Sequence, residues 1–134
     1  MALFQTPADV KSLSTNFADF EYIQAASTVV QGQPVRLSGN KYQPASSATA
    51  VDAMVTHIAL TCSSTGGYFW GQKSGAIHLG ATLVDAETYY VDSVAGKIQD
   101  EDDVGTGEFP TILGQSSSTS AFQIRFSAGL SAKP

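Results

Sequence analysis

The stretch that decides the fold runs from Val55 to Phe126 and opens with VTHIALTCSSTGGYFWGQKSGAIHLG (residues 55–80). It is a series of short apolar runs, each of strand length, separated by glycines and small polar residues. The runs are Val55–Cys62, Tyr68–Gln72, Ala76–Leu79, Tyr89–Asp92, Phe109–Leu113 and Ala121–Ser127. Runs that recur about every 8–14 residues, with turn residues between them, are typical of a compact antiparallel β domain.

The pattern predicts a mainly β protein, either a jelly-roll-like β-sandwich or a small β-barrel, with a short N-terminal arm and helix. Residues 1–16 are assigned to the arm and helix, and residues 17–134 to the β domain. The clearest strand is Phe122–Phe126, in which apolar and polar residues alternate with the period of two that a half-buried strand requires. Ser38-Gly39-Asn40 is a tight-turn signal, which predicts a hairpin of Pro34–Leu37 with Lys41–Pro44.

The N-terminal residues combine an apolar arm with a helix-start signal. Leu3 and Phe4 have nothing local to pack on, so the core or a partner must cover them. Thr6-Pro7-Ala8-Asp9 is typical of a helix N-terminus, with proline at the first helical position and an acid near the positive end of the helix dipole. Val10 and Leu13 are three residues apart, so we expect a helix of two turns that docks both side chains inward.

Composition and charge narrow the class of function. The chain has 134 residues, of which 43% are apolar and only 14% charged, against roughly 25% charged in an average globular protein. This weakly charged surface favours a protein that packs against another protein in a fixed place. The net charge is −5 and the seven basic residues are scattered, whereas binding to a phosphate backbone needs them clustered. We therefore expect no nucleic-acid partner.

The N-terminal residues and the apolar runs predict neither a secreted nor a membrane protein. Met1-Ala2-Leu3-Phe4 lacks the basic segment and the sustained apolar core of a signal peptide. The longest apolar runs fall far short of a membrane span. We expect a protein that is made in a cytosol and has no membrane partner.

Residues that carry chemistry are few and follow no catalytic pattern. Cys62 is the only cysteine, so no disulfide within the chain is possible, and its place at the end of an apolar run predicts a buried position. His57 and His78 lie in different runs, and the apolar set that begins with Thr56 and Ile58 is expected to face the core, which leaves His57 outward or at an edge. The chain has no Gly-x-Ser-x-Gly elbow and no phosphate-binding glycine motif. We expect no enzyme activity, metal or cofactor.

Two clusters leave alternatives open. The run Asp100–Asp103 is most simply a solvated acidic loop, but it also has the ligand type for a hard cation or for a basic partner surface. The aromatic run Tyr68–Trp70, with Tyr89, Tyr90 and Tyr42, suits a core and a subunit interface, and it also suits a platform on which sugars stack. Because adjacent rings of a strand point to opposite faces, at most Tyr68 and Trp70 share a surface.

Seven segments between about Thr28 and Phe126 follow a common order of turns and strands: Val30–Val35, His57–Leu60, Gly75–Leu83, Tyr89–Asp92, Ala95–Ile98, Asp102–Glu108 and Thr111–Gly114. In this order, most of the chain resembles the small decoration or cement proteins of tailed-bacteriophage heads. Similar β modules also occur in phage fibres and appendages.

The resemblance implies a viral structural protein that binds the outer surface of the capsid in the virion and stabilises the head against internal genome pressure. It implies synthesis in the cytoplasm of a host bacterium. The partners would be the major capsid protein and other copies of the chain, as a homotrimer at a local three-fold axis in preference to a dimer at a two-fold axis. The alternative is a fibre or appendage module that binds host-surface glycans. The candidate residues for the capsid or subunit interface are Leu3, Phe4, Val10, Leu13, Tyr68 and Trp70.

Overall fold

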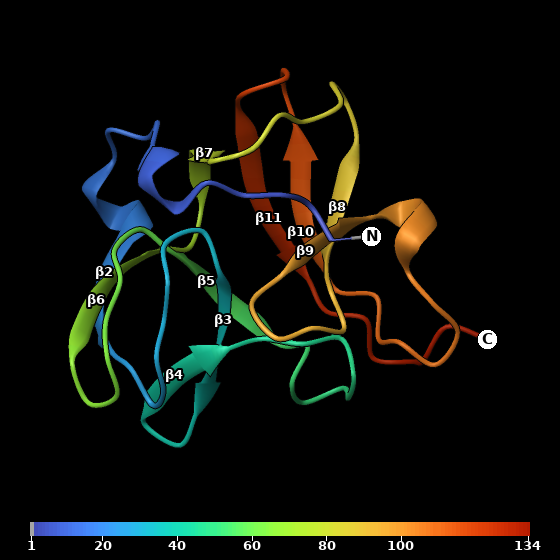
Figure 1. Ribbon diagram of the computed structural model, residues 1–134, viewed down its shortest axis with the longest axis horizontal. Helices are drawn as coiled ribbons and strands as arrows, with labels where there is room; N and C mark the ends of the chain where they lie inside the picture. The colour runs from blue at the N-terminus through green and yellow to red at the C-terminus, as the bar shows by residue number, and fades with distance from the viewer. Residues whose placement is uncertain (1) are drawn as a thin grey trace.

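Two antiparallel β-sheets pack on each other in a sandwich-like arrangement (Figure 1), as the computed structural model of residues 2–134 shows. The sheets are not closed into a barrel, so of the two expected forms the sandwich is confirmed. Met1, the first residue of the expected arm, lies outside the described residues.

The larger sheet has six strands. Their order is β1 (Val10–Ser12), β7 (Gly75–Leu79), β11 (Phe122–Ser127), β10 (Ile112–Ser116), β8 (Thr88–Val91) and β9 (Ile98–Asp100). In β11 the side chains of Phe122 and Ile124 are buried while Gln123 and Arg125 are exposed, so the predicted alternation is confirmed.

The smaller sheet has five strands. Their order is β2 (Phe20–Gln24), β6 (Tyr68–Gln72), β5 (Val55–Ala59), β3 (Pro34–Ser38) and β4 (Lys41–Pro44). β3 and β4 form the predicted hairpin, with Ser38 opposite Lys41 and Gly39 in the turn at φ +67°. An isolated bridge between Ala25 and Tyr42 links the chain just after β2 to β4, so the two edges of this sheet curl toward each other.

The molecule has two apolar cores, one on each side of the five-stranded sheet. The main core lies between the sheets and includes Ile58 of β5 with Ile77, Leu113 and Phe122 of the larger sheet. The second core lies inside the curl of the smaller sheet; its buried residues are Ile23, Ala25, Val29, Val35, Ala59 and Phe69. Neighbouring residues of one strand point to opposite faces, so Ile58 and Ala59 serve different cores. The strand β5 is therefore covered on both sides.

The N-terminal segment differs from the expected two-turn helix. Only Pro7–Asp9 is helical, as a single 3-10 turn (η1), and Val10 already begins β1, which pairs with β7. The sheet thus takes over before a second helical turn forms, because Val10 buries its side chain in the main core as a strand residue, leaving it 7% exposed. Leu13 is 43% exposed rather than docked.

The arm before this turn is bound along the body of the molecule. The Leu3 amide donates to the Ile98 carbonyl, and the Thr6 amide to the Gly80 carbonyl. Between them the Gln5 side-chain amide donates to the carbonyls of Gly32 and Leu79, at 3.0 and 2.9 Å. The arm therefore ties a loop of the smaller sheet to a strand of the larger one.

Two further sequence expectations were wrong. His57 is buried, with 4% exposure, because β5 is covered on both faces and has no outward side at that position. Cys62 is exposed, since β5 ends at Ala59 and the chain turns outward before reaching it. The remaining short helical turns are η2 (Phe17–Asp19) and η3 (Glu101–Asp103).

Candidate functional site

Three large aromatic side chains form a cluster on the outside of the five-stranded sheet. Tyr68 and Trp70 come from β6, and Tyr22 comes from β2, where it lies directly opposite Trp70. The Tyr22 ring stacks on Tyr68 with centroids 5.4 Å apart, and lies 5.0 Å from the Trp70 ring at a tilt of 41°. The side chain of Tyr22 is 57% exposed, that of Tyr68 is 53% exposed and that of Trp70 is 38% exposed. We call Tyr22, Tyr68 and Trp70 the aromatic cluster.

Hydrogen bonds of the Trp70 backbone, in the middle of β6, hold this cluster in place. The Trp70 amide donates to the Thr61 hydroxyl at 2.9 Å, and the Trp70 carbonyl accepts from the Leu60 amide at 2.8 Å. Phe69, between the two exposed rings, is fully buried in the second core. The cluster is thus attached to a strand whose opposite face is anchored in apolar packing, which restricts its motion.

The sequence predicted part of this cluster. Tyr68 and Trp70 share one exposed surface, as the alternation of a strand requires. Tyr22 was missed, because it is brought to Trp70 by the pairing of β2 with β6, and the two residues are 48 positions apart in the chain. The only local signal was the alternation of side chains between two faces in residues 17–23. It indicates a strand but does not indicate which strand pairs with it.

The other predicted interface residues lie elsewhere and in two different environments. Val10 is in the larger sheet with its side chain in the main core, and Leu3 packs against the same core from outside. Phe4, by contrast, is 84% exposed, and Leu13 is 43% exposed. Of these four residues, Phe4 and Leu13 present apolar surface to solvent, whereas Leu3 and Val10 mainly stabilise the fold.

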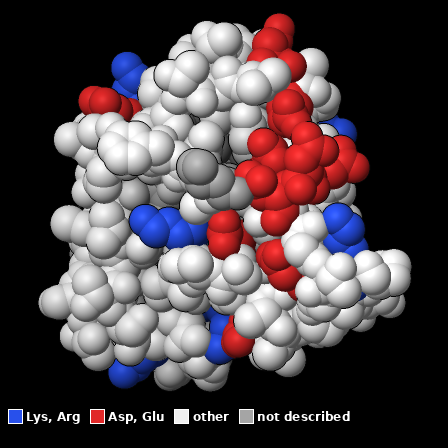
Figure 2. Space-filling model, turned by 45° about the vertical axis from the view of Figure 1, so that its right-hand side comes forward, with Lys and Arg blue, Asp and Glu red and all other residues white. Residues whose placement is uncertain are grey.

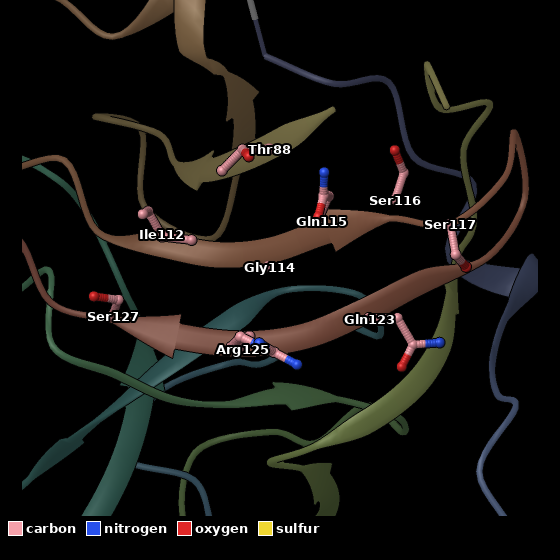
Figure 3. A pocket seen from close by; sticks show the side chains of 9 residues that line it. All are labelled: Thr88, Ile112, Gly114, Gln115, Ser116, Ser117, Gln123, Arg125 and Ser127. Atoms are coloured by element: carbon pink, nitrogen blue, oxygen red, sulfur yellow. The ribbon is translucent and has the colours of Figure 1, made fainter. Parts of the chain in front are cut away.

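A shallow groove crosses the outer face of the larger sheet (Figure 3). It has a volume of about 380 Å³, and its lining includes Thr88 of β8, Gln115 of β10, and Gln123 and Arg125 of β11. At its centre Gly114 forms a bulge with φ +151°, where a Cβ atom would lie 2.0 Å from the Gln123 carbonyl oxygen. The groove offers amide, hydroxyl and guanidinium groups for hydrogen bonding, but its lining holds no acid or histidine to act as a general base.

Acidic residues collect on one face of the molecule (Figure 2). Residues 85–108, which include β8, β9 and η3, hold eight of the twelve acids and one of the seven bases, a net charge of −7. We call this segment the acidic edge. Some of its carboxylates are structural: Asp92 accepts a hydrogen bond from the Val94 amide, and Asp100 accepts one from the Asp103 amide.

Within residues 2–134, no three His, Cys, Asp or Glu side chains are arranged to hold a metal ion. His57 and His78 lie in different sheets, and the Nδ1 atom of His78 accepts a hydrogen bond from the Gly80 amide at 3.0 Å. None of the helical turns in the described part of the chain has the length and apolar character of a membrane-spanning helix. A scan against protein-family models found no match to the chain, and neither did a search of curated proteins.

Proposed function

We propose that this protein is a capsid decoration protein, a viral structural protein that binds the outer surface of a tailed-phage head and stabilises it against genome pressure. The observation that carries the proposal is the aromatic cluster. Tyrosine and tryptophan are the residues most enriched where binding energy concentrates at protein interfaces. Rings that are held rigidly and left half-exposed lose little conformational entropy when a partner covers them.

The rest of the surface supports the same proposal. Other large apolar side chains on it are more than 40% exposed, among them Phe4, Leu13, Leu37, Val51 and Met54. Single exposed apolar residues are ordinary on a soluble protein, but these occur on a chain with few charges. A surface of this composition suits a protein whose surface is largely buried by partner proteins when it is assembled.

The proposed partners are the major capsid protein and further copies of the chain, a trimer in preference to a dimer. A stable interface generally buries more than about 1,000 Å². A chain of 134 residues reaches such an area most easily when several linked copies each contact the shell, because the contacts then add through avidity. Exposed Phe4, on the arm, is the proposed contact to a neighbouring subunit.

The test mixes the purified protein with heads that lack it, then measures bound protein and the temperature at which DNA is released. Trp70→Ala should weaken binding by about 30-fold, the change that corresponds to about 2 kcal/mol at a central interface residue. Phe17→Ala is the matched control, because Phe17 is a 77% exposed aromatic residue outside the cluster. Equal binding by wild type and Trp70→Ala would contradict the assignment of the cluster.

A second candidate, a fibre or appendage module that binds host glycans, is favoured by the same exposed rings. Sugars stack on open ring faces. The Tyr22 ring, however, is stacked on Tyr68 with only 24° between the planes, so one face of each of these rings is turned toward the other ring and away from a sugar. A glycan array separates the two functions: sugar binding that Trp70→Ala abolishes, with head binding unchanged, would favour the glycan module.

A further inference from the structure

A hollow lies where the N-terminal arm meets the end of β7, beside the turn between β10 and β11. It has a volume of about 340 Å³ and shares no lining residue with the groove on the outer face of the larger sheet. Its lining comes from three segments that are far apart in the sequence and includes Phe4, Thr6, Asp9, His78, Thr82 and Thr119. We call it the β7 hollow.

Backbone contacts hold these three segments together. The Thr6 amide donates to the Gly80 carbonyl at 2.6 Å, and the Leu83 amide donates to the Thr119 carbonyl at 2.8 Å. A Cβ atom on Gly80, where φ is +74°, would overlap the Thr6 carbonyl oxygen, so the arm lies this close to β7 because residue 80 is a glycine. The walls of the hollow are therefore fixed before any ligand binds.

Several polar groups of the β7 hollow have no hydrogen-bond partner among residues 2–134. The Nδ1 atom of His78 accepts from the Gly80 amide at 3.0 Å, so the proton of the neutral ring is on Nε2, which is left as a free donor. The Asp9 carboxylate and the hydroxyls of Thr6 and Thr119 also make no hydrogen bond within the described chain. The hollow thus offers an N–H donor, a carboxylate acceptor and hydroxyls that both donate and accept.

The remaining lining narrows the chemistry of a ligand. Phe4 is 84% exposed and presents an open ring. The described lining includes Asp9 but no Lys or Arg, so an anionic ligand is disfavoured. A purely apolar ligand would cover the Asp9 carboxylate and the His78 N–H without pairing them, which is costly. A fitting ligand therefore combines an apolar face with several hydroxyls and carries no negative charge.

We propose that the β7 hollow binds one ring of a neutral pyranose saccharide. The C–H face of the sugar stacks on Phe4, neighbouring sugar hydroxyls donate to Asp9, and a further hydroxyl accepts from Nε2 of His78. The site is distinct from the aromatic cluster, and the inference does not depend on the proposed function. Because Phe4 is also the proposed contact to a neighbouring subunit, the sugar and that subunit would compete for its ring.

The test is an NMR titration of the full chain, in which the backbone amide signals are followed while a sugar is added. The probes are the methyl glycosides of glucose, galactose and mannose, which differ in the orientation of single hydroxyls. At least one of them should shift the amide signals of Ala81, Thr82 and Thr119 and leave those of β6 in place. Absence of binding by all three sugars, or shifts centred on β6, would overturn the proposal.

Variants then test the two groups that carry the argument. Asp9→Asn keeps the shape of the side chain but removes its charge, and should weaken sugar binding by at least about tenfold, as expected for a hydrogen bond to a charged group. Phe4→Ala should weaken it by about fivefold, as expected for one aromatic contact. Asp85→Asn and Phe17→Ala are the matched controls, because both residues are exposed and lie outside the hollow. Unchanged binding by Asp9→Asn would contradict the proposal.

Choline is the competing probe, because a cation could place its charge against both Phe4 and Asp9. Each sugar that shifts the amides of the hollow should bind more tightly than choline. If choline binds more tightly than all three sugars, the hollow is a site for cations and the proposal is overturned.

Discussion

The two sheets differ in which faces are packed and in what they expose to solvent. The smaller sheet exposes a surface that favours association, whereas the larger sheet carries a charged edge that repels like molecules. The smaller sheet is packed on both faces at β5 and presents the aromatic cluster at β2 and β6. The larger sheet has one face in the main core, an outer face of glutamines and Arg125, and the acidic edge. An uncharged aromatic surface favours association, whereas a net charge of −7 on one segment keeps like molecules apart.

Figure 1 places these regions at opposite ends of the long axis of the molecule, with β2 and β6 at one end and η3 near the other. A copy that adheres through the aromatic cluster would thus hold its acidic edge away from the contact. Such an arrangement requires the two sheets to behave as one rigid body.

The largest loss of unfolding free energy is expected when one large side chain is removed from either core. Phe69 and Phe122 are both fully buried, Phe69 in the second core and Phe122 in the main core. Replacing either by alanine should cost about 3–5 kcal/mol of unfolding free energy, because the cavity loses both transfer energy and packing contacts. Urea unfolding measures this loss, followed by the fluorescence of Trp70 and by far-UV circular dichroism.

The two probes should report one transition in each variant, since β5 supplies Ile58 to one core and Ala59 to the other. If Phe69→Ala instead shifts the Trp70 signal to lower urea and leaves the dichroism unchanged, the sheets unfold separately. The two sheets would then be independent folding units.

A smaller loss of unfolding free energy is expected from a substitution in the Gly114 bulge under the groove. At Gly114 a Cβ would lie 2.0 Å from a backbone oxygen, in a left-handed conformation, so Gly114→Ala should cost about 3 kcal/mol. Gly39→Ala is the control, because Gly39 also has a positive φ but no atom within 4 Å of its Cβ position. That substitution should cost about 1 kcal/mol. Equal melting temperatures for the two variants would show that β11 moves aside at Gly114.

Whether a strand is packed on one face or on both explains how well its structure could be predicted from the sequence. β11 faces solvent on one side, so its alternation is visible in the sequence and its faces were predicted correctly. β5 is covered on both sides, and buried strands lose alternation, so the side chain of His57 was placed on the wrong side. β10 was predicted as Phe109–Leu113 but spans Ile112–Ser116, because a strand with a glycine bulge continues past a residue that usually signals a turn.

Long-range pairing was also beyond sequence reasoning. The stretch Ala45–Ala53 has the small residues that are typical of a loop, and it consists mostly of turns, yet Ala45 and Ala53 are fully buried in the main core. Small residues in a connection are compatible with solvent exposure and with close packing alike. Only the arrangement of the sheets distinguishes these environments, as it does for Tyr22 in the aromatic cluster.

The smallest loss of stability is expected at a carboxylate of the acidic edge whose hydrogen bonds hold parts of the fold together. Glu108 accepts hydrogen bonds from the Ser47 hydroxyl, the Gln99 amide and the Gly105 backbone. Burial raises the pKa of Glu108, but these hydrogen bonds and the charge of Lys133 outweigh it and bring the pKa below the ordinary 4.5. The ionised form therefore stabilises the fold above pH 4.5, and this contribution is lost as the pH falls through the lowered pKa.

Glu108→Gln should lower the unfolding free energy at pH 7 by about 1–2 kcal/mol, which is less than the roughly 1.5–3 kcal/mol typical of hydrogen bonds to charged groups because Glu108 is partly exposed. The gap to wild type should shrink as the pH falls below 4.5, which thermal melts across this range would measure. Asp102→Asn is the matched control, because it removes one exposed charge of the same edge and should change stability by less than about 0.5 kcal/mol. If both variants stabilise the protein alike, repulsion governs the whole edge, and Glu108 does not join the 45–53 connection to β9 as the structure indicates.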